Sequence, residues 1–165
     1  RQMCIRDSLY ILMHGLAKGG LFLCAGIVEQ KTHTKDITQL GGLMSTMPIT
    51  AISFLLCAFS VMGIPPLGGF FSKYMVLAGA VQTGHVWIVS LYVLTAFLTI
   101  IYLMRVFVKV FLGEGKGKEG VYEGSPTMVL SVAMLAFLSV VGGLFIRMPT
   151  GLAQGAVFQM MGVMP

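Results

Sequence analysis

Five long apolar segments, separated by polar loops, constrain this chain more than any other feature of its sequence. They cover about 9–28, 48–64, 68–81, 85–112 and 126–146. A helix needs roughly 20 apolar residues to cross the hydrocarbon core of a bilayer, and the third segment is the short one. We therefore expect an all-α fold: a polytopic transmembrane helix bundle with five spans, followed by a short C-terminal apolar segment.

The chain carries too few charges for a water-soluble globule. Of its 165 residues, 10% are charged and 56% are hydrophobic, whereas soluble domains are roughly 25% charged. This balance excludes an ordinary cytosolic enzyme, a disordered chain and a disulfide scaffold. The basic residues are scattered between apolar runs, so we expect the lipid bilayer as the surroundings and no nucleic acid as a partner.

The two ends of the sequence differ from this pattern. Residues 1–7 (RQMCIRD) are polar and lack the order of a secretory signal peptide. We expect them to be a cut loop or a stretch foreign to the protein. Residues 147–165 are apolar but short and interrupted by glycine, so they predict an interfacial helix or a truncated sixth span.

Lysine and arginine near the ends of the segments give an expected orientation. With five spans, the N-terminal side would hold Arg1, Arg6, Arg105, Lys109, Lys116 and Lys118, and the opposite side Lys31, Lys35 and Arg147. Because cytoplasmic loops carry the excess of positive charge, this count favours a cytoplasmic N-terminal side. Without residues 1–7 the two sides are nearly balanced.

Sequence motifs for cofactors are absent. No cysteine pair has CxxC spacing, and there is neither a phosphate-binding loop nor a GxGxxG after a strand. We therefore expect no cofactor, no bound metal and no catalytic centre in this chain.

Lys18 is the most informative residue, because it lies near the middle of the first apolar segment. It is about ten residues, roughly 15 Å, from either end of that segment. A charge at mid-membrane costs at least ~2.5 kcal/mol, so Lys18 should face other helices or a hydrated cavity. His14 precedes it by one helical turn and shares its face. The pair predicts a proton relay. The alternatives are a structural lysine bound to helix carbonyls and a histidine satisfied in the core.

Lys73 follows a break rich in glycine and proline. The break consists of Gly63, Pro65, Pro66, Gly68 and Gly69. It frees backbone amides and carbonyls at membrane depth, which is tolerated only where protein or a water-filled cavity satisfies them. Such interrupted segments indicate ion sites in transporters. The alternative is a re-entrant turn with Lys73 at the membrane interface.

No acidic residue lies inside a predicted span. The six acids, all in loops or at segment ends, are Asp7, Glu29, Asp36, Glu114, Glu119 and Glu123. Two intramembrane lysines without a carboxylate imply that other helices supply the counter-charges. We therefore expect the chain to be an incomplete part of a larger protein.

Three strings of the sequence resemble one known family. They are HGLAKGGLFLCAG at 14–26, TKDITQLGGLMSTMP at 34–48 and GIPPLGGFFSKYMVLAG at 63–79. Over about 9–146 the chain is similar to the antiporter-like proton-pumping subunits of respiratory complex I. The same resemblance extends to Mrp-type sodium/proton antiporters and to the membrane subunits of energy-converting hydrogenases. It implies an inverted-repeat antiporter fold, of which residues 8–146 would be the C-terminal part.

The resemblance also implies a function and partners. Lys18 and Lys73 match the lysines of the family's polar axis, and His14 matches the accompanying histidine. The function implied is proton translocation as a non-redox subunit of a redox-driven complex, of the NADH-quinone oxidoreductase or membrane-bound hydrogenase type, in a prokaryotic inner membrane. Its partners would be the missing N-terminal helices of its own subunit and other membrane subunits, with H⁺ or Na⁺ as the transported ion. The alternatives are an Mrp-type secondary Na⁺/H⁺ antiporter subunit and a membrane scaffold without transport.

Overall fold

The computed structural model of the chain describes residues 2–82, 84–113 and 122–145, with side chains from Tyr10 onward. Every regular element in these ranges is helical. The five α-helices are α1 (Gln2–Thr32), α2 (Pro48–Met62), α3 (Gly68–Gln82), α4 (Val86–Phe107) and α5 (Pro126–Leu144). A 3₁₀ turn, η1 (Ile37–Gln39), precedes α2, and a π-helical turn, η2 (Val108–Leu112), extends α4. The predicted all-α architecture is confirmed.

Local sequence signals explain three of the helix ends. Pro48 and Pro126 occupy first-turn positions of α2 and α5, where a missing N–H costs nothing. Gly63 ends α2 in the left-handed region with φ of 85°, and its N–H bonds back to the last turn, as at many helix C-termini.

The first helix starts earlier than expected. It begins at Gln2 rather than at about residue 9, so residues 2–7, expected as a cut loop or a stretch foreign to the protein, are helical. The physical reason is that neither glycine nor proline occurs before Gly15, so no residue in this stretch interrupts a helix. The predicted C-terminal segment, 147–165, lies outside the described residues.

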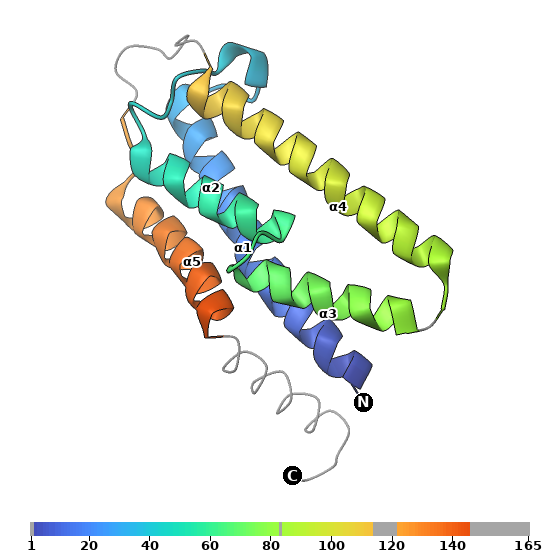
Figure 1. Ribbon diagram of the computed structural model, residues 1–165. Helices are drawn as coiled ribbons and strands as arrows, with labels where there is room; N and C mark the ends of the chain where they lie inside the picture. Colours follow the sequence, from blue (N-terminus) through green and yellow to red (C-terminus); the bar gives the residue numbers. More distant parts are fainter. Residues whose placement is uncertain (1, 83, 114–121, 146–165) are drawn as a thin grey trace.

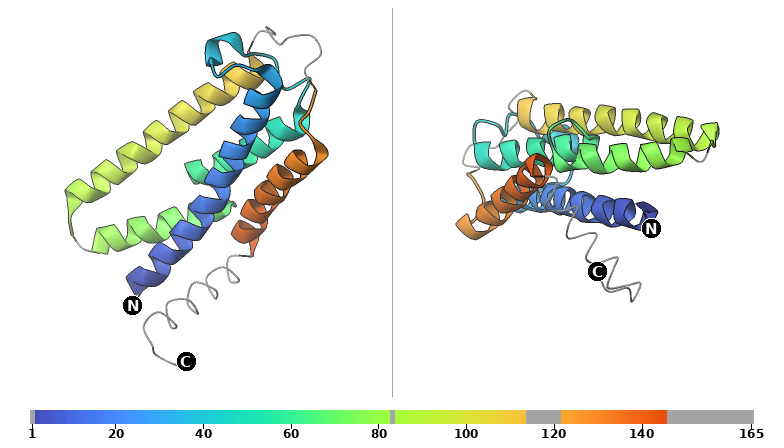
Figure 2. Two further views of the ribbon diagram at one scale, coloured as in Figure 1. Left: turned by 180° about the vertical axis from the view of Figure 1, so that it is seen from behind. Right: turned by 60° about the horizontal axis from the view of Figure 1, so that its bottom comes forward.

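Helix α1 lies at the centre of the bundle. It packs against α2, α3 and α5, whereas α4 packs on α2 and α3. Helices α2 and α3 follow one another in one row, with α1 on one side and α4 along the other (Figures 1 and 2). The buried core between them includes the rings of Phe54, Phe107 and Phe111, whose centroids are 5.3–6.2 Å apart.

Helices α2 and α3 are each too short to cross a bilayer core alone. Each has 15 residues, or about 22 Å of helix, which is less than the ~30 Å hydrocarbon core. Within the described residues, the stretches long and apolar enough to cross alone are Tyr10–Thr32, Val86–Leu112 and Pro126–Leu144. The five predicted helices are all present, and within the described residues three of them are long and apolar enough to span a membrane alone.

This arrangement corrects the expected distribution of charge. The five-span count placed Lys31 and Lys35 on the side opposite Arg105 and Lys109. In the structure the loop after α1 meets the end of α4: the Leu43 amide donates to the Val110 carbonyl at 3.4 Å, and the Met44 amide donates to the Phe111 carbonyl at 3.0 Å. All four basic residues therefore lie toward one end of the bundle.

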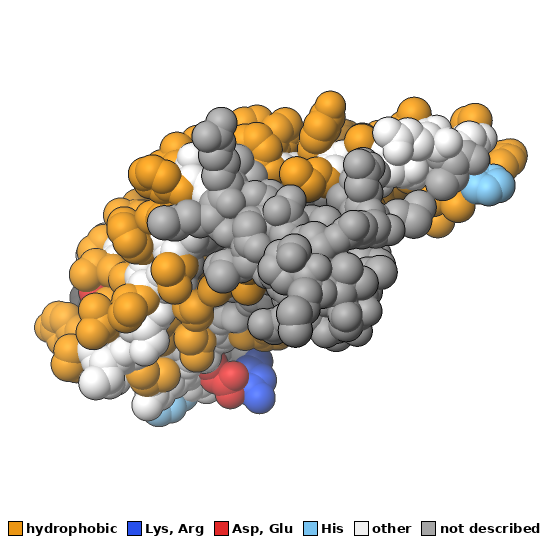
Figure 3. Space-filling model, turned by 90° about the horizontal axis from the view of Figure 1, so that it is seen from below, with side chains coloured by type: hydrophobic (Ala, Val, Ile, Leu, Met, Phe, Trp, Pro, Cys, Tyr) orange, Lys and Arg blue, Asp and Glu red, His pale blue; other side chains and the backbone are white. Residues whose placement is uncertain are grey.

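Much of the described surface is apolar. Helix α4 exposes a series of large apolar side chains, of which Trp87 is 89% exposed. Seen from below, apolar side chains spread widely over the described part of the surface (Figure 3). Exposed apolar area on this scale marks contact with lipid or with further helices.

Candidate functional site

A polar cavity of about 240 Å³ separates α1 from α4. Its lining residues are Tyr10, His14, Lys18, Val61, Lys73, Tyr92, Thr95, Ala96, Thr99 and Tyr102. Helix α1 contributes the first three, α3 contributes Lys73, and α4 contributes the last five. The three residues that the sequence predicted as relay members thus lie around one space.

The α1 wall of this cavity presents a ring and an ammonium group one turn apart. The Tyr10 ring stacks on the His14 imidazole, with centroids 5.2 Å apart and an interplanar angle of 14°. This stack fixes the plane of the imidazole. Lys18 lies one turn further along and lines the cavity, and it is exposed in the described chain.

Lys73 reaches back from α3 to the broken end of α2. Its Nζ donates a hydrogen bond to the Met62 carbonyl at 3.4 Å. Met62 is the last residue of α2, where carbonyls lack helical partners. The Lys73 residue is half-buried in the described chain.

The glycine and proline residues of the break allow this close packing. Its Gly69 amide donates to the Ser60 hydroxyl at 3.3 Å, and a Cβ at Gly69 would collide with the Ser60 carbonyl. A Cβ at Gly68 would collide with the Met13 sulfur of α1 and come close to the Gly143 amide of α5. Protein groups, rather than lipid, therefore satisfy and cover the freed backbone, as buried polar groups at membrane depth require.

The α4 wall was missed by the sequence analysis. Its hydroxyl residues are Tyr92, Thr95, Thr99 and Tyr102. Spacings of three and four residues put them on one helical face, so the periodicity of hydroxyls within an apolar segment was the available signal. The Tyr92 hydroxyl donates to the Lys73 carbonyl at 3.4 Å, which joins this wall to α3.

The cavity contains no carboxylate among its lining residues. The described acidic side chains act elsewhere. Glu29 pairs with Lys35 at 3.2 Å on the surface, and Glu123 Oε1 accepts hydrogen bonds from the Ile49 and Thr50 amides at the start of α2. Asp36 caps η1, where hydrogen bonds from the Thr38 hydroxyl and amide hold the pKa of its carboxyl below the ordinary value.

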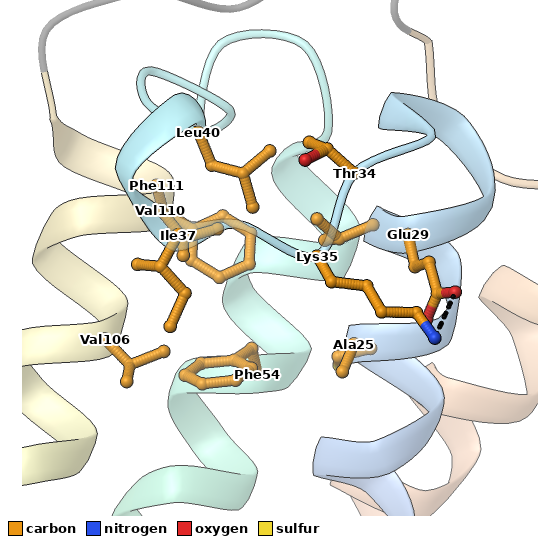
Figure 4. Close-up of a pocket in the computed structure, with 12 residues that line it drawn as sticks. Ala25, Glu29, Thr34, Lys35, Ile37, Leu40, Phe54, Val106, Val110 and Phe111 are labelled. Atoms are coloured by element: carbon orange, nitrogen blue, oxygen red, sulfur yellow. Dashed lines mark ion pairs between the residues drawn. The ribbon is translucent and has the colours of Figure 1, made fainter.

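A second cavity of about 240 Å³ lies nearer the other end of α1. Figure 4 shows apolar side chains such as Leu40, Phe54 and Val110 around it, with the Glu29–Lys35 ion pair at one edge. It contains neither of the intramembrane lysines and does not fit a proton relay. Within the described ranges, no group of three or more His, Cys, Asp or Glu side chains is placed to hold a metal ion.

Comparisons with known proteins identify the relatives of this chain. Residues 4–99 match the family described as NADH:quinone oxidoreductase/Mrp antiporter, TM. The chain is 36% identical over 149 residues to Na(+)/H(+) antiporter subunit A1 of Staphylococcus saprophyticus, which covers 82% of this chain and 18% of that protein. It is also 36% identical over 104 residues to NADH-quinone oxidoreductase subunit N of Desulforudis audaxviator, covering 63% of this chain and 21% of that protein.

One solved structure has the same fold. A chain in the structure of the Mrp complex from Dietzia sp. DQ12-45-1b superposes with a TM-score of 0.83 over 94% of this chain and 37% of that one, at 21% identity. The present chain thus spans about a fifth of the length of the curated relatives it matches.

Apolar helices, one of them broken beside a charged cavity, define a multi-pass membrane protein of the ion-transporter class. The chain belongs to the NADH:quinone oxidoreductase/Mrp antiporter transmembrane family. It is an antiporter-like membrane subunit, homologous to subunits of multi-subunit complexes in both branches of that family. The resemblance drawn from the three sequence strings is confirmed.

Proposed function

We propose that this chain is part of a subunit that translocates protons across the membrane as a component of a redox-driven complex. The observation that carries the proposal is that Lys18, His14 and Lys73, from two helices, line one polar cavity. Ionisable groups inside membrane segments are expensive and mark ion pathways. A scaffold without transport would have no use for three such groups around one space.

The relay would exchange protons between the two lysines through His14 and ordered water. Two ammonium groups at one cavity repel each other, and the lining contains no carboxylate to offset that repulsion. Loading a proton on one lysine therefore favours its release from the other. The imidazole of His14, which can donate from one nitrogen and accept at the other, provides the intermediate station.

Further helices would supply the negative charges that balance the two lysines and would shield Lys18 from lipid. Lys18 is exposed in the described chain, and at mid-membrane that exposure to lipid would be costly. We infer that further helices of the same subunit and other membrane subunits lie against this side. Residues 8–146 would then be the C-terminal part of a larger antiporter-type transmembrane domain.

The arrangement of the helices also supports an orientation. With α2 and α3 as one crossing, Lys31, Lys35, Arg105 and Lys109 share one end of the bundle. The positive-inside rule then favours a cytoplasmic position for this end and the opposite side for the start of α1, in a prokaryotic inner membrane. This orientation reverses the one expected from five separate spans.

The second candidate function is an Mrp-type secondary Na⁺/H⁺ antiporter subunit. It is supported by the similarity to Na(+)/H(+) antiporter subunits A1 and D, and it would use the same residues. The two functions differ in their energy source. Genes for quinone-oxidoreductase or hydrogenase subunits next to this one would favour the first function, and a run of small antiporter subunits the second.

The test uses inverted membrane vesicles that contain the full-length subunit in its complex, with a fluorescent dye reporting the pH gradient. We expect Lys18→Ala and Lys73→Ala each to abolish most of the gradient driven by electron transfer. Lys35→Ala, in an exposed ion pair, is the matched control and should leave it unchanged. Wild-type pumping by both intramembrane variants would overturn the proposal, and a gradient that requires added Na⁺ but no electron donor would favour the antiporter.

A further inference from the structure

We propose that the hydroxyl face of α4 is the acceptor wall of the relay cavity: a row of positioning residues that orders water between Lys73 and Lys18. The row consists of Tyr92, Thr95, Thr99 and Tyr102, all of which line the cavity. The inference rests on the proposed function, because it assigns a role to the wall opposite the predicted relay residues.

The hydrogen bonds of the two threonines determine what they offer to water. The Thr95 hydroxyl donates to the Tyr92 carbonyl at 2.8 Å, and the Thr99 hydroxyl donates to the Thr95 carbonyl at 2.7 Å. Each hydroxyl has one hydrogen and two lone pairs. With the hydrogen engaged inside the helix, each oxygen can only accept from the cavity.

The opposite walls have the complementary chemistry. A lysine ammonium group has three donors and no acceptor. A water molecule between Lys18 or Lys73 and a threonine oxygen therefore accepts from the lysine and donates to α4. This fixes its orientation, and a cavity of about 240 Å³ has room for several waters at ~30 Å³ each.

The row is long enough to guide a chain of such waters. Tyr92 and Tyr102 are ten residues apart, or about 15 Å along the helix, which is about half of the hydrocarbon core. Helices α1 and α4 run in the same direction along the bundle (Figure 1). The wall from Tyr92 to Tyr102 therefore extends alongside the α1 wall from Tyr10 to Lys18.

A neutral wall suits proton transfer better than a charged one. A carboxylate on α4 itself, inside the cavity, would form a direct ion pair with the nearer lysine and hold its proton in place, unlike the more distant counter-charges expected from other helices. A hydroxyl oxygen orients water without trapping the positive charge. The α4 wall thus orients the water molecules in the cavity and leaves both lysines free to release their protons.

Threonine in a membrane helix often bonds to its own backbone for purely structural reasons, so the test must separate the two roles. We would compare two double variants. The first, Thr95→Val with Thr99→Val, keeps the shape of both side chains but removes both acceptor oxygens. The second, Thr95→Ser with Thr99→Ser, keeps the oxygens. Ser90→Ala, which removes a hydroxyl of α4 outside this row, is the control. Pumping is measured per assembled complex in the same vesicles as Lys18→Ala and Lys73→Ala.

We expect several-fold slower pumping by the double valine variant and near wild-type rates for the double serine variant and Ser90→Ala. Wild-type pumping by the double valine variant would overturn the proposed acceptor role of α4, and so would equally slow pumping by the double serine variant. The lysine variants test the relay itself independently of that result. Wild-type pumping by the lysine variants would overturn both proposals. Should the double valine variant assemble poorly, the single variants replace it, and wild-type rates in both would overturn the wall.

Discussion

Lys73 and Met62 join the two helices on either side of the break: the ammonium group of Lys73 on α3 donates to the carbonyl at the last residue of α2, at 3.4 Å. The same side chain also lines the polar cavity. Lys73 therefore has a structural role, because it stabilises the Met62 carbonyl, and a role in the proposed relay, where it would carry a proton.

Substitution of Lys73 can separate these tasks. Lys73→Arg keeps a donor for the Met62 carbonyl but does not release its proton, so we expect near wild-type thermal stability in detergent with pumping lost. Lys73→Met removes the donor as well, and the free energy of unfolding should fall by about 1 kcal/mol. Thermal unfolding of the purified complex and the vesicle assay measure the two effects. Pumping by Lys73→Arg at the wild-type rate would contradict a role in proton release.

Gly69 is the position of the break that tolerates a side chain least. A Cβ there would collide with the Ser60 carbonyl, and the backbone would have to move. We expect Gly69→Ala to cost about 1–3 kcal/mol and to lower the amount of subunit in the membrane. Gly26→Ala, where a Cβ meets nothing within 4 Å, is the control. Equal amounts of both variants, measured by immunoblot, would show that the break is more open than described.

Glu123 fixes the start of α2 from a distant part of the sequence. Its Oε1 accepts from the Ile49 amide at 2.7 Å and the Thr50 amide at 3.2 Å, a carboxylate at the positive end of a helix. Glu123→Ala should lower thermal stability by about 1–2 kcal/mol. Glu29→Ala breaks only an exposed ion pair, worth at most ~1 kcal/mol, and should have a smaller effect. The reverse order in a melting experiment would contradict this role for Glu123.

The loop after α1 should respond to acid through Asp36. Because hydrogen bonds from Thr38 lower the pKa of Asp36 in the folded chain, the carboxylate stabilises η1 above the unfolded pKa of about 3.9. That stabilisation is lost as the pH falls through the lower, folded pKa. We expect the hydrogen-exchange protection of the Thr38 amide to fall in that acidic range. Asp36→Asn should remove the pH dependence, and an unchanged profile in that variant would contradict the assignment.

The sequence by itself determined the helices and most of their limits. Three kinds of signal act through neighbouring residues and can be read in a single sequence. They are the long apolar segments, proline at the first turn of a helix (Pro48 and Pro126), and the left-handed glycine at a helix end (Gly63). His14 and Lys18 were placed on one face by the helical repeat alone. The break before Lys73 followed from glycine and proline in the same local way.

Only the tertiary structure decided how these parts combine. The packing of α2 and α3 against α1 and α4 decides that the loop after α1 meets the end of α4, and the orientation we propose rests on that contact. The same packing brought Thr95 and Thr99 to face the lysines and Glu123 to the start of α2. These relationships join residues far apart in the chain, and no local propensity encodes which distant surfaces meet.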